Sequence, residues 1–167
     1  VVENAFRWLV SAADERAGLA MCAINLSGQS MGDDQFLPFV IQQFRTSGLD
    51  ASKICFEITE TSAIANFSQA SRFIQALHGL GCKFALDDFG NGVGAFANLK
   101  TLGIDYLKID GNFIRNLARD PVSQAMVSAM VKLARTLNFR IIAEQVEDTT
   151  ALEAARRMGI DFVQGYA

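Results

Sequence analysis

Two adjacent carboxylates, Asp87 and Asp88, lie where a short apolar run, residues 84–86, meets a glycine-rich segment. Like charges at this spacing repel each other, so a folded protein keeps them mainly for cation binding, proton transfer or a partnered structural use. The glycine-rich segment, residues 90–94, does not complete a G-x-G-x-x-G motif because Ala95 occupies the last glycine position. We therefore expect a mobile lid there and not a phosphate cradle.

Other polar side chains follow apolar runs in the same way. Each of six strand-like runs leads to a polar or ionisable residue, and these residues are Asn25, Glu57, Asp87, Lys108, Glu144 and Gln164. Carboxylate and amide oxygens without a nearby histidine or cysteine suit Mg²⁺ or Mn²⁺ better than Zn²⁺. Two such ions would neutralise the paired aspartates and bind both an attacking water and a phosphate, which is the chemistry of phosphodiester hydrolysis.

Lys108 and Glu144 suit supporting roles in such a site. Lys108 could orient the water or stabilise charge on the phosphate, and Glu144 could hold the second metal or accept a proton. Each residue taken alone also has a structural explanation, since a single Asn or Glu at a strand end is more often a turn or helix cap than a ligand. Lys108 alone could be an ion-pair residue, and Gln164 alone is typical of a structural residue. Their joint occurrence after successive strands favours the metal site.

The elements that must position these residues alternate between two hydrophobic patterns. Helical spacing is found in residues 2–13, 35–46, 68–80, 120–136 and 148–158, with a short helical piece near 96–102. Strand-like runs are found in residues 19–24, 53–56, 84–86, 106–109, 140–143 and 161–163. This alternation predicts an α/β fold with a parallel sheet, either doubly wound or closed as a barrel.

The position of the polar residues distinguishes these two folds. All strand ends converge on one mouth in a barrel, whereas an open sheet brings together only those beside its switch point. We therefore expect a TIM-like (β/α) barrel. A complete barrel has about eight strand–helix units and about 250 residues, and this sequence shows six units. We expect a segment of a larger domain, whose outer strands have unpaired edges that another part of the protein covers.

Composition narrows the class of protein. The sequence has 167 residues, half of them apolar, and a net charge of −3, which indicates one globular core. Its basic residues form no stripe, so duplex nucleic acid is not an expected partner. No apolar run approaches the roughly 18 residues of a membrane span. We expect a soluble, cytoplasmic segment without membrane contact, although its parent protein could be membrane-anchored.

The cysteines and the single histidine add little chemistry. Cys22, Cys55 and Cys82 have no C-x-x-C spacing, which predicts reduced thiols and agrees with a cytosolic location. His78 falls at the end of an expected helix, where a surface or capping position is expected. With one histidine, His-based metal sites and catalytic triads are excluded.

Six short motifs together resemble the EAL family of bacterial phosphodiesterases, which act on cyclic di-GMP. The motifs occur in family order at residues 23–27 (AINLS), 56–61 (FEITET), 87–90 (DDFG), 108–111 (KIDG), 143–147 (AEQVE) and 164–166 (QGY). The resemblance covers essentially the whole chain. It implies a modified barrel that uses two divalent cations, Mg²⁺ or Mn²⁺, to hydrolyse cyclic di-GMP to linear pGpG.

The resemblance also implies roles for individual residues. The implied metal ligands are Asn25, Glu57, Asp87 and Asp88. The implied catalytic residues are Asp88, Lys108 and Glu144. Asp88 would also help to hold the nucleophilic water. Gln164 would lie beside the metal-bound water or the nucleotide. Glu60 would anchor the loop after Asp88, through which the family couples homodimer formation to activity.

The sequence departs from the family pattern at three places. Gly94 and Ala95 stand where small hydroxyl residues are more frequent, and Gln145 replaces a common glycine, a change from which we expect no consequence. The Glu-Ala-Leu signature belongs on strand–helix material outside this sequence. We therefore expect residues 1–167 to be the C-terminal two-thirds of an EAL domain, inactive without that material and attached in the full protein to GGDEF or sensor domains.

Two alternative functions remain open at this stage. A catalytically inactive EAL-like domain could bind cyclic di-GMP and act as a sensor or effector through a protein partner. A barrel that binds one Mg²⁺ and uses Lys108 as a base could instead abstract a proton beside a carboxylate. Adjacent aspartates and an asparagine ligand suit that third reaction less well.

Overall fold

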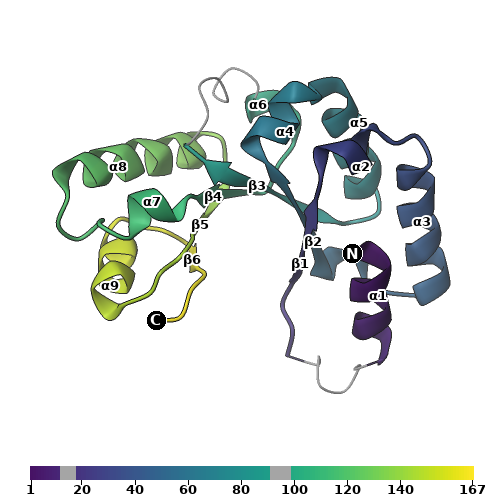
Figure 1. The fold of residues 1–167 in the computed structure, drawn as a ribbon, viewed down its shortest axis with the longest axis horizontal. Coiled ribbons are helices and arrows are strands. Elements are labelled where there is room, and N and C mark those ends of the chain that lie inside the picture. Colours follow the sequence, from purple (N-terminus) through teal and green to yellow (C-terminus); the bar gives the residue numbers. More distant parts are fainter. Residues whose placement is uncertain (12–17, 91–98) are drawn as a thin grey trace.

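The chain folds around one six-stranded parallel sheet, as seen in a computed structural model that describes residues 1–11, 18–90 and 99–167. The strands pair in sequence order and are β1 (Cys22–Leu26), β2 (Ile54–Thr59), β3 (Lys83–Phe89), β4 (Tyr106–Ile109), β5 (Arg140–Ala143) and β6 (Phe162–Val163). A doubly wound sheet would reverse its strand order at a switch point. Here the sheet arches into a half-barrel, so the predicted TIM-like barrel is confirmed for the six units of this chain (Figure 1).

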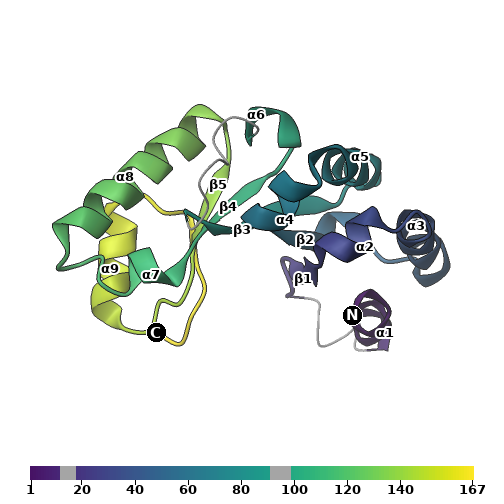
Figure 2. The ribbon, with the colours of Figure 1, turned by 45° about the horizontal axis from the view of Figure 1, so that its top comes forward.

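Helices cover the convex side of this arch. They are α1 (Val2–Ser11), α2 (Gly28–Gly32), α3 (Phe36–Ser47), α4 (Glu60–Ala65), α5 (Phe67–His78), α6 (Leu99–Leu102), α7 (Gly111–Ile114), α8 (Pro121–Thr136) and α9 (Thr149–Arg157), with a 3₁₀ turn at Ala51–Lys53. Figure 2 shows α8 and α9 at one end of the arch and α1 and α3 at the other. Within the described ranges, none of these helices is long and apolar enough to cross a bilayer.

The long helices agree with the sequence pattern, and α6 lies within the predicted short helical piece, but the other short helices were not predicted. Three of them, α2, α4 and α7, follow directly after β1, β2 and β4 and begin at Ser27, Thr59 and Asp110, whose side chains accept a backbone N–H bond. Helices of four to six residues are too short to show a hydrophobic period. For these helices, the capping residue indicates the start of the helix, which the hydrophobic period cannot do.

The first three strands extend further than predicted. Asn25, Glu57 and Asp87, expected just beyond their strands, lie inside β1, β2 and β3. Neighbouring strands supply the backbone hydrogen bonds that keep these polar residues in the sheet. Residues 12–13 of the first expected helix, residues 96–98 of the short helical piece and residues 91–94 of the expected lid lie outside the described residues.

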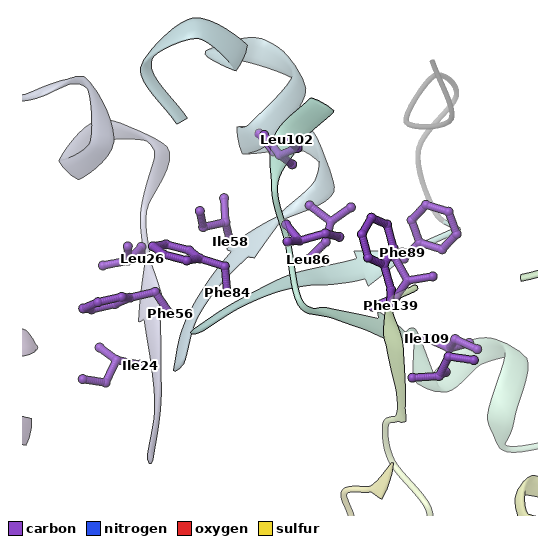
Figure 3. Packing of buried hydrophobic residues seen from close by; sticks show 14 of the residues in the cluster. Ile24, Leu26, Phe56, Ile58, Phe84, Leu86, Phe89, Leu102, Ile109 and Phe139 are labelled. Carbon is purple, nitrogen blue, oxygen red and sulfur yellow. The ribbon is translucent and has the colours of Figure 1, made fainter. Parts of the chain in front are cut away.

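Side-chain alternation along the strands separates the core from the site. Apolar residues of β1, β2 and β3 point to the convex side and pack in one buried cluster, which includes Ile24, Phe56, Ile58, Phe84 and Leu86 (Figure 3). Residues between them, such as Glu57, face the concave side. The phenylalanine rings of the cluster interlock with the outer helices, since Phe73 of α5 makes an edge contact with both Phe56 and Phe84.

His78 corrects one expectation. It lies at the end of α5, but its Nε2 is 2.9 Å from Asp105 Oδ2, and its ring meets Phe84 edge-on. Asp105 also accepts bonds from Lys83 Nζ and from the backbone N–H of Phe84, each at 2.9 Å. His78 is therefore one member of a network that ties the end of α5 to β3 and β4, and not a simple surface or capping residue.

Candidate functional site

A buried lysine contacts carboxylates from β2, from β3 and from the residue that follows β5. Lys108 of β4 is 2% exposed, and its Nζ lies 3.1 Å from Glu57 Oε2, 2.9 Å from Asp87 Oδ1 and 2.6 Å from Glu144 Oε1. Glu57 comes from β2, Asp87 from β3, and Glu144 directly follows β5. Four of the residues predicted from strand ends thus form one ion-pair cluster.

The strand register explains this convergence. Asn25 and Glu57 are direct partners across β1 and β2, which places the exposed Asn25 beside the buried carboxylate. The backbone N–H of Glu144 donates to Ile109 O over 3.1 Å, which continues the β4–β5 pairing one residue beyond β5. Glu144 is therefore held next to Lys108 by the sheet itself.

An irregularity in β3 brings both aspartates to the same site. Neighbouring residues of a regular strand point to opposite faces, so Asp87 and Asp88 would normally be separated. The β3–β4 register shifts between Leu86 and Phe89, and Asp88 has a left-handed φ of 57°. As a result, Asp87, Asp88 and Glu144 each offer an oxygen atom within 4.8 Å of one another.

This set of donors fits a hard divalent cation. The three converging groups are carboxylates, and Asn25 and Glu57 add oxygen donors from the neighbouring strands. Oxygen donors of this kind suit Mg²⁺ or Mn²⁺. Asp87 Oδ1 is already engaged by Lys108 and by the backbone N–H of Asp88 at 3.1 Å, so a cation at this oxygen would share it with Lys108.

The pKa values of the cluster reflect burial opposed by ion pairing. Burial alone would lower the pKa of Lys108, but its bonds with Glu144 and Asp87 outweigh burial and raise that pKa above the ordinary value. Burial raises the pKa of Glu144, and Lys108 only partly offsets this. Burial and the neighbouring Asp87 charge raise the pKa of Asp88. The lysine therefore stays charged, while two carboxylates are more easily protonated than usual.

Glu60 holds the residue at which the glycine-rich segment begins. This side chain is 2% exposed at the start of α4, and its Oε2 accepts the backbone N–H of Gly90 over 3.0 Å. Its second oxygen, Oε1, is buried and has no hydrogen-bond partner among the described atoms. Gly90 has a φ of 108°, and a Cβ there would lie 2.5 Å from Met130 Cε. Glu60 and the packing around Gly90 thus fix the chain two residues beyond Asp88.

Gln164 lies beside the cluster but outside its ion pairs. Its backbone N–H donates to Ala143 O over 2.8 Å, and its carbonyl accepts the N–H of Val146 over 3.0 Å. The pocket next to it has a volume of about 430 Å³ and is lined by Glu144, Gln145, Glu147, Gln164, Gly165 and Tyr166. This pocket opens directly beside Glu144 and could receive a ligand that reaches the carboxylates.

Sequence reasoning missed a contact between Arg115 and Gln145. Gln145 has a φ of 52°, a left-handed backbone that glycine adopts easily, and its Oε1 accepts a hydrogen bond from Arg115 Nη2. The sequence pattern alone did not predict a contact from the residue that replaces a common glycine at this position. The signal that was available is the polar side chain itself at a position typical of glycine.

Known proteins share both the sequence and the fold of this chain. A family model described as "EAL domain" matches residues 1–167. The chain is 36% identical to the cyclic di-GMP phosphodiesterase PdeB of Shewanella oneidensis, over 100% of this chain and 19% of that protein. It is 38% identical to the cyclic di-GMP phosphodiesterase PdeF of Escherichia coli, over 99% of this chain and 22% of that protein.

Solved structures agree with these sequence matches. The c-di-GMP complex of the PaMucR phosphodiesterase aligns with a TM-score of 0.90 at 32% identity, over 99% of this chain and 67% of that chain. The manganese and c-di-GMP complex of Klebsiella pneumoniae BlrP1 aligns with a TM-score of 0.87 at 27% identity, over 99% and 42%. The chain spans only about a fifth of the length of the two curated phosphodiesterases, 19% and 22%.

Proposed function

Because this chain belongs to the EAL domain family, we propose that its intact domain hydrolyses cyclic di-GMP to linear pGpG with two divalent cations, Mg²⁺ or Mn²⁺. One observation carries the proposal, namely the convergence of Glu57, Asp87, Asp88 and Glu144 around the buried Lys108. Relatives with 36–38% identity are named cyclic di-GMP phosphodiesterases, which supports the substrate and the reaction class.

The proposed ligands fall into two groups, one for each cation. Asn25, Glu57 and Asp87 are the proposed ligands of one cation, and Asp88 helps to hold the second one and the nucleophilic water. When bound, the cations lower the pKa of water and neutralise negative charge on the phosphate. Asp88 suits its role because the shifted register of β3 turns it toward Asp87 and Glu144.

Lys108 and Glu144 serve the chemical step. Water attacks phosphorus, one bond from phosphorus to a ribose oxygen breaks, and the product carries one terminal phosphate and one free hydroxyl. Lys108 remains charged and can donate hydrogen bonds to the phosphate or the water as negative charge develops. Glu144 accepts a proton from the water, the leaving ribose oxygen takes up a proton from solvent, and Glu144 then returns its proton to solvent, so that the protons balance.

The residues around this centre have proposed roles in nucleotide binding and in regulation of the activity. The pocket beside Glu144, which includes Gln164, is the proposed position of the nucleotide. The bond from Gly90 to Glu60 is the proposed anchor of the following loop, through which two copies of the domain form a homodimer. A relative 35% identical to this chain, MucR of Pseudomonas aeruginosa, is named a bifunctional diguanylate cyclase and phosphodiesterase. We propose a similar attachment to GGDEF or sensor domains, and a cytoplasmic location.

Turnover by the full-length protein tests the proposal. Cyclic di-GMP is incubated with Mn²⁺ or Mg²⁺, and the product is identified by chromatography and mass spectrometry. Linear pGpG is expected from the wild type, and Asp87→Ala should lower kcat by roughly 10²–10³-fold, the range found when one stabilising group of an active site is removed. Glu153→Ala, at an exposed position of α9, is the matched control and should keep wild-type activity.

Binding measurements separate the remaining outcomes. Isothermal titration of the same proteins with cyclic di-GMP reports affinity without turnover. Tight binding by a wild type that never releases pGpG would contradict hydrolysis and support the inactive sensor. A protein that neither binds nor cleaves cyclic di-GMP would contradict both functions.

A further inference from the structure

We propose that Gln145 is a positioning residue, whose side chain is held by Arg115 over Gly111 and thereby fixes the turn that presents Glu144. The inference rests on the proposed function only for its activity assays. It concerns a contact of this chain's own residues, since Gly111 begins α7 after β4, Arg115 caps the end of α7, and Gln145 lies just after β5.

The first observation is the backbone of Gln145. This residue directly follows Glu144 and has a φ of 52°, in a region that residues with a side chain rarely adopt. Glu144 N–H and Val146 N–H on either side are bonded to Ile109 O and Gln164 O. The sheet thus holds both neighbours, whereas the peptide of Gln145 itself must be kept in place by another interaction.

The second observation is that the side chain of Gln145 has that interaction. Its Oε1 accepts a hydrogen bond from Arg115 Nη2, and its Cβ and carboxamide lie directly over Gly111. A Cβ at Gly111 would lie 2.7 Å from Cβ of Gln145, so only glycine leaves room for this side chain. Gly111 is buried, and the exposed side chain of Gln145 covers it in close contact.

The third observation links this contact to the proposed catalytic pair. Gly111 is three residues beyond Lys108 in sequence, and Gln145 is one residue beyond Glu144. Ile109 and Ala143 pair in register, and Lys108 Nζ meets Glu144 Oε1 at 2.6 Å. The same two chain segments are therefore joined twice, once by the Lys108–Glu144 ion pair and once by Gln145 on Gly111. Movement of one turn against the other would displace Glu144 from Lys108.

Exposure separates a positioning role from a purely structural one. Both Arg115 and Gln145 are exposed, and exposed contacts contribute little to the global stability of a fold. Gln145 also lines the pocket beside Glu144 and Gln164, whereas Arg115 lines a second hollow with Arg119 and Thr150. Loss of the contact should therefore change the site while the melting temperature stays nearly constant.

Two substitutions of Gln145 relieve its backbone and remove the contact. Glycine adopts a left-handed φ freely, and asparagine tolerates it but is one methylene too short to reach Arg115. In the full-length protein, Gln145→Gly and Gln145→Asn should each reduce kcat or Mn²⁺ affinity by roughly 10- to 100-fold, as for residues that orient metal ligands. The melting temperature should change little, and kcat should fall by a larger factor than KM for cyclic di-GMP rises, since Gln145 also lines the pocket proposed for the nucleotide.

Gln145→Glu, Arg115→Met and the double variant of Arg115→Met with Gln145→Gly test the contact itself, and Asn138→Gly is the control. Gln145→Glu keeps the length and the acceptor for Arg115 and should restore most of the kcat lost in Gln145→Asn. Arg115→Met should show the same loss as Gln145→Gly, and the double variant should be no worse than either single one, since both remove one interaction. Asn138→Gly relieves a left-handed φ of 60° in the turn between α8 and β5 and should keep wild-type kcat.

Two readouts decide the inference. Unchanged kcat and unchanged Mn²⁺ affinity in Gln145→Gly would overturn it, as would additive losses in the double variant. A wild type that binds Mn²⁺ without cleaving cyclic di-GMP would contradict the proposed function alone. The inference would then be judged by the Mn²⁺ affinities of the variants, measured by isothermal titration.

Discussion

Lys108 and Glu144 form a 2.6 Å ion pair between adjacent strands, and the lysine also contacts Asp87 at 2.9 Å and Glu57 at 3.1 Å. One buried positive charge is thus shared by carboxylates that are also the proposed cation ligands. Lys108 and a bound cation would therefore interact with the same carboxylates. This relationship predicts how the protein behaves with and without metal.

Lys108→Met should destabilise the metal-free protein strongly. Removing one partner of a buried ion pair leaves uncompensated charge and costs about 3–5 kcal/mol. Added Mn²⁺ should restore part of this loss because a cation returns positive charge to the same carboxylates. Urea unfolding in EDTA and in Mn²⁺ measures both effects. Lys132→Met, at an exposed position of α8, is the control, and equal midpoints for the Lys108 and Lys132 variants in EDTA would contradict the prediction.

Gly90→Ala should cost more stability than Gly48→Ala. Both glycines have a left-handed φ, 108° and 64°, and that conformation costs an alanine roughly 1–2 kcal/mol. A Cβ at Gly48 meets nothing within 4 Å, whereas a Cβ at Gly90 would lie 2.5 Å from Met130 Cε. Overpacking should therefore add roughly 1–3 kcal/mol at Gly90. Thermal unfolding checks the difference, and similar losses in the two variants would argue against the packing around Gly90.

Asp105→Asn should reduce stability at neutral pH but not in acid. Burial opposes ionisation of Asp105, but bonds from Lys83, the Phe84 N–H and His78 outweigh it and lower the pKa of this carboxyl. A lowered folded-state pKa adds stability above the unfolded value of about 3.9, and this stability is lost as pH falls through the folded pKa. The wild type should exceed the variant by about 1.5–3 kcal/mol at pH 7.

Urea unfolding at several pH values tests this sign. The difference between wild type and Asp105→Asn should be full at pH 7 and should shrink as the pH drops below about 4. A difference that grows in acid would show that the ionised Asp105 does not stabilise the fold. Asp33→Asn, at an exposed position after α2, provides a carboxyl outside this network for comparison.

The three cysteines should differ sharply in reactivity. Burial raises the pKa of both Cys55 and Cys82 to about 12, so neither forms the reactive thiolate at pH 8. Cys22 is only half-buried, although burial raises its pKa as well. Alkylation of the native protein, followed by peptide mass spectrometry, should label Cys22 first and the other two only after denaturation. Equal rates at all three positions would contradict the burial of Cys55 and Cys82.

Much of the fold was predictable because its signals are local. The ranges of β4 and β5 coincide with the predicted runs, and α8 follows its Asp120 cap and Pro121 start. The convergence of Glu57, Asp87, Lys108 and Glu144 followed from topology alone, since parallel strands place their carboxyl ends at one edge. Sequence reasoning was accurate where an element's own pattern, or the general rule for parallel strands, determines the outcome.

The remainder depends on contacts between distant elements. The irregularity at Asp88 follows from pairing of β3 with β4, and no pattern within β3 predicts it. His78 and Asp105 are 27 residues apart, and Arg115 and Gln145 are 30 apart, so neither bond has a local signal. Tertiary packing selects such contacts, and a hydrophobic period records only which residues are buried.

The sequential strand order bears on how the chain acquires its structure. Each strand pairs with the one that precedes it by a single strand–helix unit. As synthesis proceeds, every new strand emerges beside a partner that is already available, so the sheet can lengthen from its amino-terminal side without waiting for distant segments. Glu57 of β2 and Asp87 of β3 precede in the chain the lysine that pairs with both of them. Until Lys108 is added to the chain, these carboxylates repel each other, and its positive charge then offsets that repulsion.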